Sequence, residues 1–478
     1  MEMAQLIFIP SPMMGHIAQA IELAQTIITR FHHLSATLLI INHPLDPITT
    51  TFANSLDSSA LHRVRFVHLP PADRAPTWSY KTPGGLLDLV INHHKPHVKD
   101  AIQSASGPLQ IPIAAFVVDM FCTPMIDVAN ELGLPTYVFF TSGAAFLDLM
   151  LHFQSLTDEL GRDLTALTRS CTELVIPSFF NPVPTRVLPA VLVDEDKWLP
   201  RFLLYARRYR EAKGIIVNTF SELESHAVGS FDGRTNTPPI FPVGPLLNRA
   251  QTNHDRQSEI TSWLDGQPAS SVLYLCFGTM GGFHGEQVKE IAKGLEMAGY
   301  RFIWSLRRPS PKGKTGFASE YPDPEKVLPE GFLKRTAEIG RVIGWAPQMA
   351  VLSHKAIGGF VSHCGWNSLL ESIWCGVPVA TWPIYAEQQL NAFQMVRELG
   401  LAVEITLAYN GFAADDPVMV TSEAIERGIR EVMDGDGEVR KKVMEMREKS
   451  RVAVRENGSS YKSLERLVDE LMESKGQN

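Results

Sequence analysis

Residues 345–388 read WAPQMAVLSHKAIGGFVSHCGWNSLLESIWCGVPVATWPIYAEQ and form the most informative stretch of this sequence. The middle of the stretch predicts a buried strand that runs through His363 and Gly365 into a helix. Free backbone N–H groups and the helix dipole make such a junction an anion site, and a diphosphate would suit it. An ordinary capped helix is the alternative, because Ser368 and Glu371 have the spacing of a capping box.

Along the whole chain, short apolar runs alternate with segments whose apolar residues recur at helical spacing. The expected strands are 6–10, 36–41, 64–69, 113–118 and 135–140, then 272–277, 302–306, 342–343, 359–362 and 379–382. The expected helices include 15–29, 123–132, 286–298, 348–353, 368–374 and 388–399, and a charged helical segment at 438–474. Apolar runs separated by helices are typical of parallel sheets covered on both faces. Two successive arrays predict an α/β fold with two doubly wound, Rossmann-like domains and a ligand cleft between them.

A proline-rich segment marks the expected domain boundary. Four prolines occur between positions 237 and 245, where they resist both helix and central strand. We therefore predict an N-terminal domain at 1–241, a linker at 242–257 and a C-terminal domain at 258–459.

Composition narrows the class of protein. The 478 residues carry 44 Lys and Arg against 52 Asp and Glu, a net charge of −8, which argues against a nucleic-acid or membrane-surface binder. Five scattered cysteines suit a reducing compartment. No apolar run reaches the roughly 18 residues of a membrane span, and the first residues lack the basic region of a signal peptide. We expect a cytoplasmic protein with no membrane span.

Two polar residues in the N-terminal half stand where catalytic groups are expected. His16 follows Gly15 at the start of the predicted helix 15–29, and the positive helix end favours a neutral imidazole. Asp119 directly follows the strand 113–118, at the edge of the sheet where doubly wound folds bind ligands. A general base held by a carboxylate is one interpretation, and a structural histidine is the other.

The stretch 345–388 resembles, without gaps, the donor-binding box of plant family 1 UDP-sugar glycosyltransferases. The resemblance covers the whole chain: it includes the opening Pro10-x-Pro12-x-x-Gly15-His16, the strand ending at Asp119, the proline-rich linker and SVLYLCFGT at 271–279. It implies the GT-B fold, with two Rossmann-like domains facing across a cleft. The acceptor would bind the N-terminal domain and the nucleotide sugar the C-terminal one. A final helix at 460–478 would pack back on the first domain.

The resemblance also assigns a donor role to individual residues. It implies that Trp345 stacks on uracil beside Ala346 and Gln348, and that Glu371 accepts hydrogen bonds from the ribose hydroxyls. The implied diphosphate site comprises His363, Gly365, Asn367, Ser368, Gly278 and Thr279, the last of which is serine in most family members. The implied sugar site comprises Trp366, Glu387, Gln388 and Thr141, and a terminal glutamine resembles the pattern of enzymes that use UDP-glucose.

The implied reaction is a single displacement with inversion. His16, assisted by Asp119, would remove a proton from an acceptor hydroxyl, and an α-linked donor would yield a β-O-glucoside. The expected acceptor is small and lipophilic, because Phe121, Phe140, Phe146 and the stretch 147–153 suggest an apolar cavity, although these residues also suit a core. The stretch 176–189 resembles a subgroup that acts on phenolic and terpenoid compounds, so the resemblance implies a phenolic, flavonoid or terpenoid acceptor. We expect a monomer.

No metal or cofactor is expected, because the UDP-sugar is a co-substrate. Residues 194–196 (DED) imitate the metal motif of another glycosyltransferase fold but lie in a polar loop, far along the chain from the donor box. His93, His94 and His97 lack partner ligands at zinc spacing.

Three alternatives remain open at this point. The first is the same fold with another UDP-sugar donor. The second is a non-catalytic protein that binds a UDP-sugar or another small molecule. The third is an NAD(P)-dependent oxidoreductase, which the missing GxGxxG after the first strand disfavours.

Overall fold

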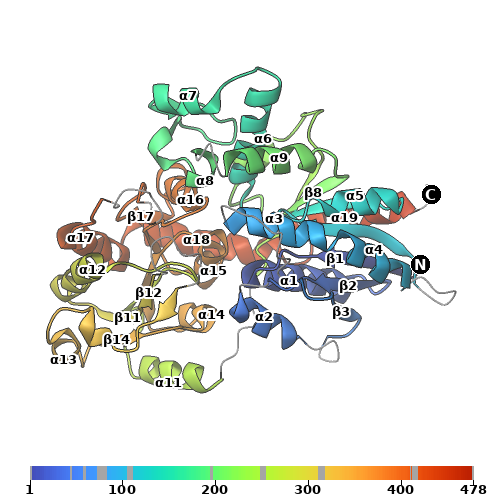
Figure 1. The fold of residues 1–478 in the computed structure, drawn as a ribbon. Coiled ribbons are helices and arrows are strands. Elements are labelled where there is room, and N and C mark those ends of the chain that lie inside the picture. The colour runs from blue at the N-terminus through green and yellow to red at the C-terminus, as the bar shows by residue number, and fades with distance from the viewer. Residues whose placement is uncertain are drawn as a thin grey trace. The chain divides into compact units, whose positions relative to one another are not determined.

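The computed structural model describes residues 3–43, 46–56, 61–72, 83–104, 111–193, 198–247, 254–309, 318–409, 411 and 418–475. The chain forms two compact units, which are coloured by position along the chain in Figure 1. The first unit comprises Met1–Thr165, Asp194–Asn248 and Val452–Asn478, and the second comprises Ala166–Val193 and Arg249–Arg451.

A seven-stranded parallel sheet, in the order β3-β2-β1-β4-β5-β8-β9, organises the first unit. Its strands are β1 (Ala4–Ile9), β2 (Leu34–Ile40), β3 (Val64–His68), β4 (Ile113–Asp119), β5 (Thr136–Phe140), β8 (Gly214–Val217) and β9 (Ile240–Pro242). The helices are α1 (Met14–Arg30), α2 (Pro47–Asn54), α3 (Pro83–His93), α4 (Lys95–Ser104), α5 (Met125–Glu131), α6 (Ala144–Asp158), α9 (Leu199–Tyr209), α10 (Ser225–Gly229) and α19 (Ser459–Lys475). The strand order changes direction between β1 and β4, and such a switch point is where doubly wound folds bind ligands.

A six-stranded parallel sheet, in the order β14-β11-β10-β15-β16-β17, organises the second unit. Its strands are β10 (Val272–Cys276), β11 (Arg301–Ser305), β14 (Gly340–Ile343), β15 (Ile357–Ser362), β16 (Val379–Thr381) and β17 (Ala402–Glu404). The helices are α11 (His254–Asp265), α12 (Gly285–Ala298), α13 (Phe332–Arg335), α14 (Gln348–Leu352), α15 (Trp366–Cys375), α16 (Gln388–Phe393), α17 (Ser422–Met433) and α18 (Glu438–Ala453), whose last residues belong to the first unit. The shorter helices are α7 (Leu164–Ser170) and α8 (Ala190–Val193), and 3₁₀ turns occur at Thr185–Val187 and Pro324–Lys326. Two short antiparallel ribbons pair β6 (Glu173–Leu174) with β7 (Val183–Pro184), and β12 (Arg307–Arg308) with β13 (Ser319–Glu320). The switch point here lies between β10 and β15.

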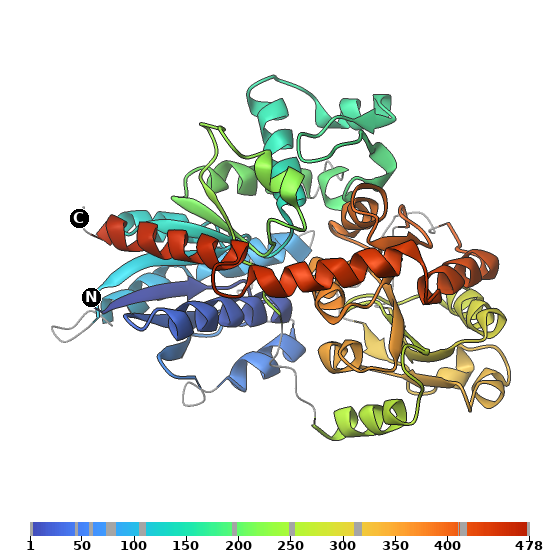
Figure 2. The ribbon, with the colours of Figure 1, turned by 180° about the vertical axis from the view of Figure 1, so that it is seen from behind.

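The last helix completes the core of the first unit. Leu464, Leu467, Val468 and Leu471 of α19 are at most 3% exposed and join the apolar cluster formed by the first strands and α1. Figure 2 shows this helix, in red, lying along the sheet. Arg466 donates to the Ile240 carbonyl at 2.7 Å and so ties the helix to the edge strand β9.

The units differ in three respects from the predicted domains. The first unit extends to Asn248, and the chain rejoins it at Val452 rather than at 460. Residues 166–193, predicted in the N-terminal domain, belong to the second unit, because Phe179 packs on Phe393 with ring centroids 6.0 Å apart and Glu398 accepts the Phe180 N–H at 2.8 Å.

The proline-rich segment contains the strand β9, which lies at the edge of the sheet, so the expectation that its prolines resist a helix and a central strand holds. One local expectation was wrong. The helix expected at 388–399 changes after Phe393 into a π-helical turn, Gln394–Glu398. Within the described ranges, no helix combines the length and apolar character that crossing a membrane requires.

Shortening one side chain of α19 tests this packing. We expect Leu467→Ala to lower the free energy of unfolding by about 2–5 kcal/mol, because Leu467 is fully buried and its loss leaves a cavity. Urea-induced unfolding measures the change. Leu204→Ala on α9 is the matched control, since Leu204 is 50% exposed and its loss should cost less than about 0.5 kcal/mol. Equal losses in the two variants would contradict the packing described here.

Candidate active site

The strand β1 and its neighbour β4 bring His16 and Asp119 together. His16 lies in the first turn of α1, shortly after the end of β1, and Asp119 is the last residue of β4. The Nδ1 atom of His16 lies 2.7 Å from Oδ2 of Asp119, and the two side chains are 20% and 1% exposed. Residues 103 positions apart therefore form a carboxylate–imidazole pair in which the carboxylate is buried and the imidazole is partly exposed.

Two further donors fix the orientation of Asp119. The Ser11 hydroxyl donates to Oδ1 at 2.5 Å, and the backbone N–H of Phe121 donates to the same oxygen at 3.0 Å. One carboxylate oxygen is thus held by the protein while the other meets the imidazole. The sequence did not identify Ser11, because nothing in its spacing links it to a residue 108 positions away.

Thr141 lies beside this pair, directly after β5. Its Oγ1 is 3.2 Å from Nδ1 of His16. The loop that carries Thr141 leads into α6, and the Glu224 carboxylate accepts the N–H groups of Ala144 and Ala145 at 2.8 and 3.0 Å. This long-range helix cap, which the sequence did not reveal, holds the start of α6 in place.

Aromatic side chains lie next to the imidazole. Phe121 stands 5.3 Å from His16 between ring centroids and contacts Phe202 and Tyr205 of α9 at 6.2 and 5.5 Å. The other apolar residues expected around the acceptor are core residues: Phe140, Phe146, Met150 and Phe153 are at most 3% exposed. Phe121 is the member of the expected set whose ring contacts His16.

In the second unit, two glycines flank the His363 imidazole. The ends of β10 and β15 are paired in the sheet, which brings Gly278, with a φ of +75°, close to His363. A Cβ atom added to Gly278 or to Gly365 would lie 2.6 Å from Nε2 of His363. The sequence indicated that Gly365 allows a ligand to approach, whereas the structure places the imidazole itself against this glycine.

Burial keeps His363 neutral. The side chain is 6% exposed, and burial lowers its pKa to about 4 despite a hydrogen bond with the Cys276 backbone. Among the described residues, its buried Nδ1 has no hydrogen-bond partner. A buried polar atom without a partner is costly, so a ligand group at this position would be stabilising.

A cluster of polar side chains joins α14 to α15. The amide Nε2 of Gln348 donates to Ser368 Oγ at 2.8 Å and to Glu371 Oε2 at 2.6 Å. Glu371 is 6% exposed, and burial raises its pKa to about 7, although the Gln348 hydrogen bond opposes the shift. The capping-box alternative is wrong, because the residue that caps α15 is Gly365 and Ser368 already lies inside the helix.

Trp345 is half-buried and precedes α14. Its backbone N–H donates to Oε1 of Glu320 at 3.0 Å, and the neighbouring Ala346 is 5% exposed. Glu320 belongs to the short strand β13, and the sequence gave no signal that this surface ribbon holds the start of the box.

The end of the box forms the first turn of α16. Gln388 is 3% exposed, and its Oε1 accepts the N–H groups of Ile384 and Tyr385 at 2.9 and 3.0 Å. Its amide Nε2 is therefore the end of the side chain that a sugar hydroxyl would meet. Glu387 precedes the helix and is half-buried. Of the remaining candidates, Trp366 is buried, Asn367 is half-buried and Thr279 is exposed.

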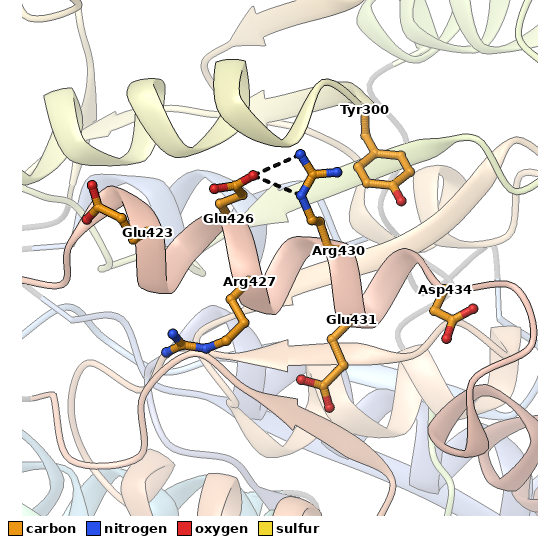
Figure 3. A pocket seen from close by; sticks show the side chains of 7 residues that line it. All are labelled: Tyr300, Glu423, Glu426, Arg427, Arg430, Glu431 and Asp434. Atoms are coloured by element: carbon orange, nitrogen blue, oxygen red, sulfur yellow. Dashed lines mark hydrogen bonds and ion pairs between the residues drawn. The ribbon is translucent and has the colours of Figure 1, made fainter.

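A separate hollow of about 620 Å³ lies over α17 and differs in character from these sites. Tyr300 and six charged residues line it. Figure 3 shows Arg430 turned toward Glu426, an ion pair of 2.8 Å. Four carboxylates (Glu423, Glu426, Glu431 and Asp434) outnumber the two arginines in this lining, so the hollow has an acidic excess that does not suit an anionic nucleotide.

The residues described by the structure include no group of three or more His, Cys, Asp or Glu side chains arranged to hold a metal ion. His93, His94 and His97 have ring centroids 5.3 to 5.5 Å apart, but both ring nitrogens of His94 face backbone carbonyls, of Val90 at 2.7 Å and Pro70 at 3.0 Å. The acidic motif 194–196 lies outside the described residues.

Comparison with known proteins decides the family. The family described as "UDP-glucoronosyl and UDP-glucosyl transferase" matches residues 240–448. UDP-glycosyltransferase 71A15 of Malus domestica is 51% identical, over 98% of this chain and 99% of its own length. This chain belongs to the plant family 1 UDP-glycosyltransferases. A further relative of this UDP-glycosyltransferase is the putative UDP-glucose flavonoid 3-O-glucosyltransferase 3 of Fragaria ananassa, 50% identical over 98% of this chain and 99% of that protein.

Solved structures agree with this family. A UGT transferase from Siraitia grosvenorii in complex with UDP is 47% identical, covers 98% of this chain and 100% of its own, and superposes with a TM-score of 0.87. UGT71G1 of Medicago truncatula, complexed with UDP-glucose, is 40% identical, covers 98% of each chain and has a TM-score of 0.85. The UDP-glycosyltransferase therefore has the GT-B fold with two Rossmann-like domains, as expected, and the oxidoreductase alternative is wrong.

Proposed function

We propose that this UDP-glycosyltransferase transfers glucose from UDP-glucose to a hydroxyl group of a small lipophilic acceptor, with inversion, and so forms a β-O-glucoside. The observation that carries the proposal is the 2.7 Å contact between His16 and the buried Asp119. A neutral imidazole held through one nitrogen by a carboxylate has the arrangement of a general base.

In this mechanism the Nδ1–H of His16 donates a hydrogen bond to the Asp119 carboxylate, and Nε2 takes the proton of the acceptor hydroxyl, so that an imidazolium forms. The acceptor oxygen attacks C1 of glucose from the face opposite UDP, and the bond between C1 and the diphosphate oxygen breaks. UDP leaves with the electron pair. Asp119 stabilises the imidazolium as it forms, because hydrogen bonds from the Ser11 hydroxyl and the Phe121 N–H already hold its carboxylate in place.

The second unit would hold the donor. Its anion site combines the neutral His363, whose buried Nδ1 lacks a partner among the described residues, with the N–H groups at the start of α15. We assign uracil to Trp345, the ribose hydroxyls to Glu371, and the glucose hydroxyls to Glu387 and Gln388. Solved relatives complexed with UDP and with UDP-glucose support a UDP-sugar as the donor.

The acceptor is proposed to be phenolic, flavonoid or terpenoid. Phe121 and its aromatic neighbours offer an apolar surface beside His16, and relatives are named for flavonoid and anthocyanidin glucosylation. The metal-independent reaction, the monomeric state and the cytoplasmic location stay predictions.

A transfer assay tests the proposed function. We expect UDP-glucose with a panel of flavonoids, simple phenols and triterpenoids to yield glucosides whose anomeric configuration by NMR is β. The physical reason is that one displacement inverts the α-configured C1. Products with an α linkage would overturn the mechanism, and turnover with another UDP-sugar in place of UDP-glucose would overturn the donor assignment.

Removal of the proposed base, His16, should lower the rate of glucose transfer without changing the affinity for UDP. We expect His16→Ala to lower kcat by about 10²–10⁴-fold on an aliphatic-alcohol acceptor, which needs base assistance, while the Kd for UDP stays unchanged. His68→Ala, at an exposed position of β3, is the control and should keep full activity. Full activity of His16→Ala on that acceptor would show that another group is the base.

The affinity for UDP-glucose should depend on pH through Glu371. Its pKa of about 7 means that the carboxylate that accepts ribose hydroxyls is lost as pH falls through that value. The diphosphate diester of UDP-glucose does not titrate there, so we expect roughly tenfold weaker binding at pH 6 than at pH 8. Calorimetry measures the Kd at each pH, and Glu371→Gln should remove most of the dependence. A wild-type Kd that is constant between pH 6 and pH 8 would contradict this role.

A further inference from the structure

The turn that carries His363 contains a residue in an unusual backbone conformation. Cys364 connects β15 to α15 with a φ of +61°, a region that residues other than glycine rarely adopt. Its side chain is fully buried, and its N–H donates to the Ser362 hydroxyl at 3.2 Å. A strained turn persists only where its surroundings hold it, so the contacts of its carbonyl matter.

The carbonyl of Cys364 is held by one side chain from another helix. The amide Nδ2 of Asn391 donates to this oxygen at 3.0 Å, and Asn391 is 2% exposed. Asn391 lies on α16, one turn after Gln388 and beyond the end of the donor box at 388. This buried hydrogen bond joins the turn around His363 to the helix whose first turn carries the proposed sugar-binding residues.

We propose that Asn391 is a positioning residue for the diphosphate site. It fixes the peptide after Cys364 and thereby the direction of the N–H groups at the start of α15, together with Gly365, against which the His363 imidazole rests. The inference deepens the proposed function and rests on it, because it requires that this turn binds the diphosphate of UDP-glucose.

The turn depends on the Asn391 amide because the Cys364 carbonyl accepts its hydrogen bond in a buried position. Without it, the Cys364 carbonyl would be buried with no donor from α16, which is costly. Rotation of the peptide would relieve both that cost and the positive φ, and it would redirect the N–H groups that the diphosphate needs. The same rotation would disturb the contact between Gly365 and His363, which leaves no room even for a methyl group.

Binding measurements on two variants of α16 test the proposal. We expect Asn391→Ala to raise the Kd for UDP, measured by calorimetry, at least tenfold, with a parallel rise in the KM for UDP-glucose and an unchanged KM for the acceptor. Gln389→Ala is the matched control. Gln389 is equally buried at 2% exposed and lies on the same helix, but its amide donates to the Tyr409 carbonyl at 2.9 Å. We expect this control to keep the Kd for UDP within about twofold of wild type.

The variant Asn391→Asp separates a positioning role from a packing role, because a loss of packing would not make UDP-glucose binding depend on pH. The side chain keeps its shape, but it can donate to the Cys364 carbonyl only when protonated. Relative to wild type at the same pH, we expect weak UDP-glucose binding at pH 8 and substantial recovery at pH 6. Circular dichroism at both pH values shows whether the variant is folded.

The outcomes separate this inference from the function on which it rests. Wild-type UDP affinity in Asn391→Ala, an equal loss in Gln389→Ala, or a folded Asn391→Asp whose relative affinity does not change with pH would overturn the positioning role alone. A wild-type protein that binds no UDP would overturn the proposed function and this inference with it.

Discussion

The pairing of parallel strands at two switch points is the constraint on which both candidate sites depend. In the first unit β1 pairs with β4, so Asp119 at the end of β4 meets His16, which shortly follows β1, at one edge of the sheet. In the second unit β10 pairs with β15, and Gly278 meets His363 in the same way. Parallel strands deliver their carboxyl ends to one edge, so residues about a hundred positions apart can form a pair without any local sequence signal.

The surroundings of three buried polar side chains differ between the two sites. Asp119 accepts hydrogen bonds from the Ser11 hydroxyl and the Phe121 N–H and lies 2.7 Å from Nδ1 of His16. Glu371 accepts a hydrogen bond from the Gln348 amide, and burial raises its pKa to about 7. His363 is kept neutral by burial, so it would serve the diphosphate as a hydrogen-bond donor rather than as a cation.

Side chains outside the recognisable motifs hold the motif residues in place. Ser11 orients Asp119, Glu320 holds the backbone of Trp345, and Asn391 holds the strained turn after His363. The contacts of Ser11 and Asn391 are buried, whereas the contact between Glu320 and Trp345 is exposed. Such contacts stabilise one orientation, which is what a site needs if its donors are to be preorganised.

The sequence by itself determined the alternation of strands and helices, the two parallel sheets and the identity of the donor box, because apolar periodicity and a gapless motif are local properties of the chain. It could not determine that residues 166–193 join the second unit or that a proline-rich segment forms an edge strand, since both depend on contacts with distant elements. Only the tertiary structure decided that Ser368 lies inside α15 and that the side-chain oxygen of Gln388 accepts N–H groups from the preceding loop. It also decided that Ser11 and Asn391 support the two sites. Hydrogen bonds between residues far apart in the chain leave no periodicity in the sequence, and they form only when the sheets have brought their ends together.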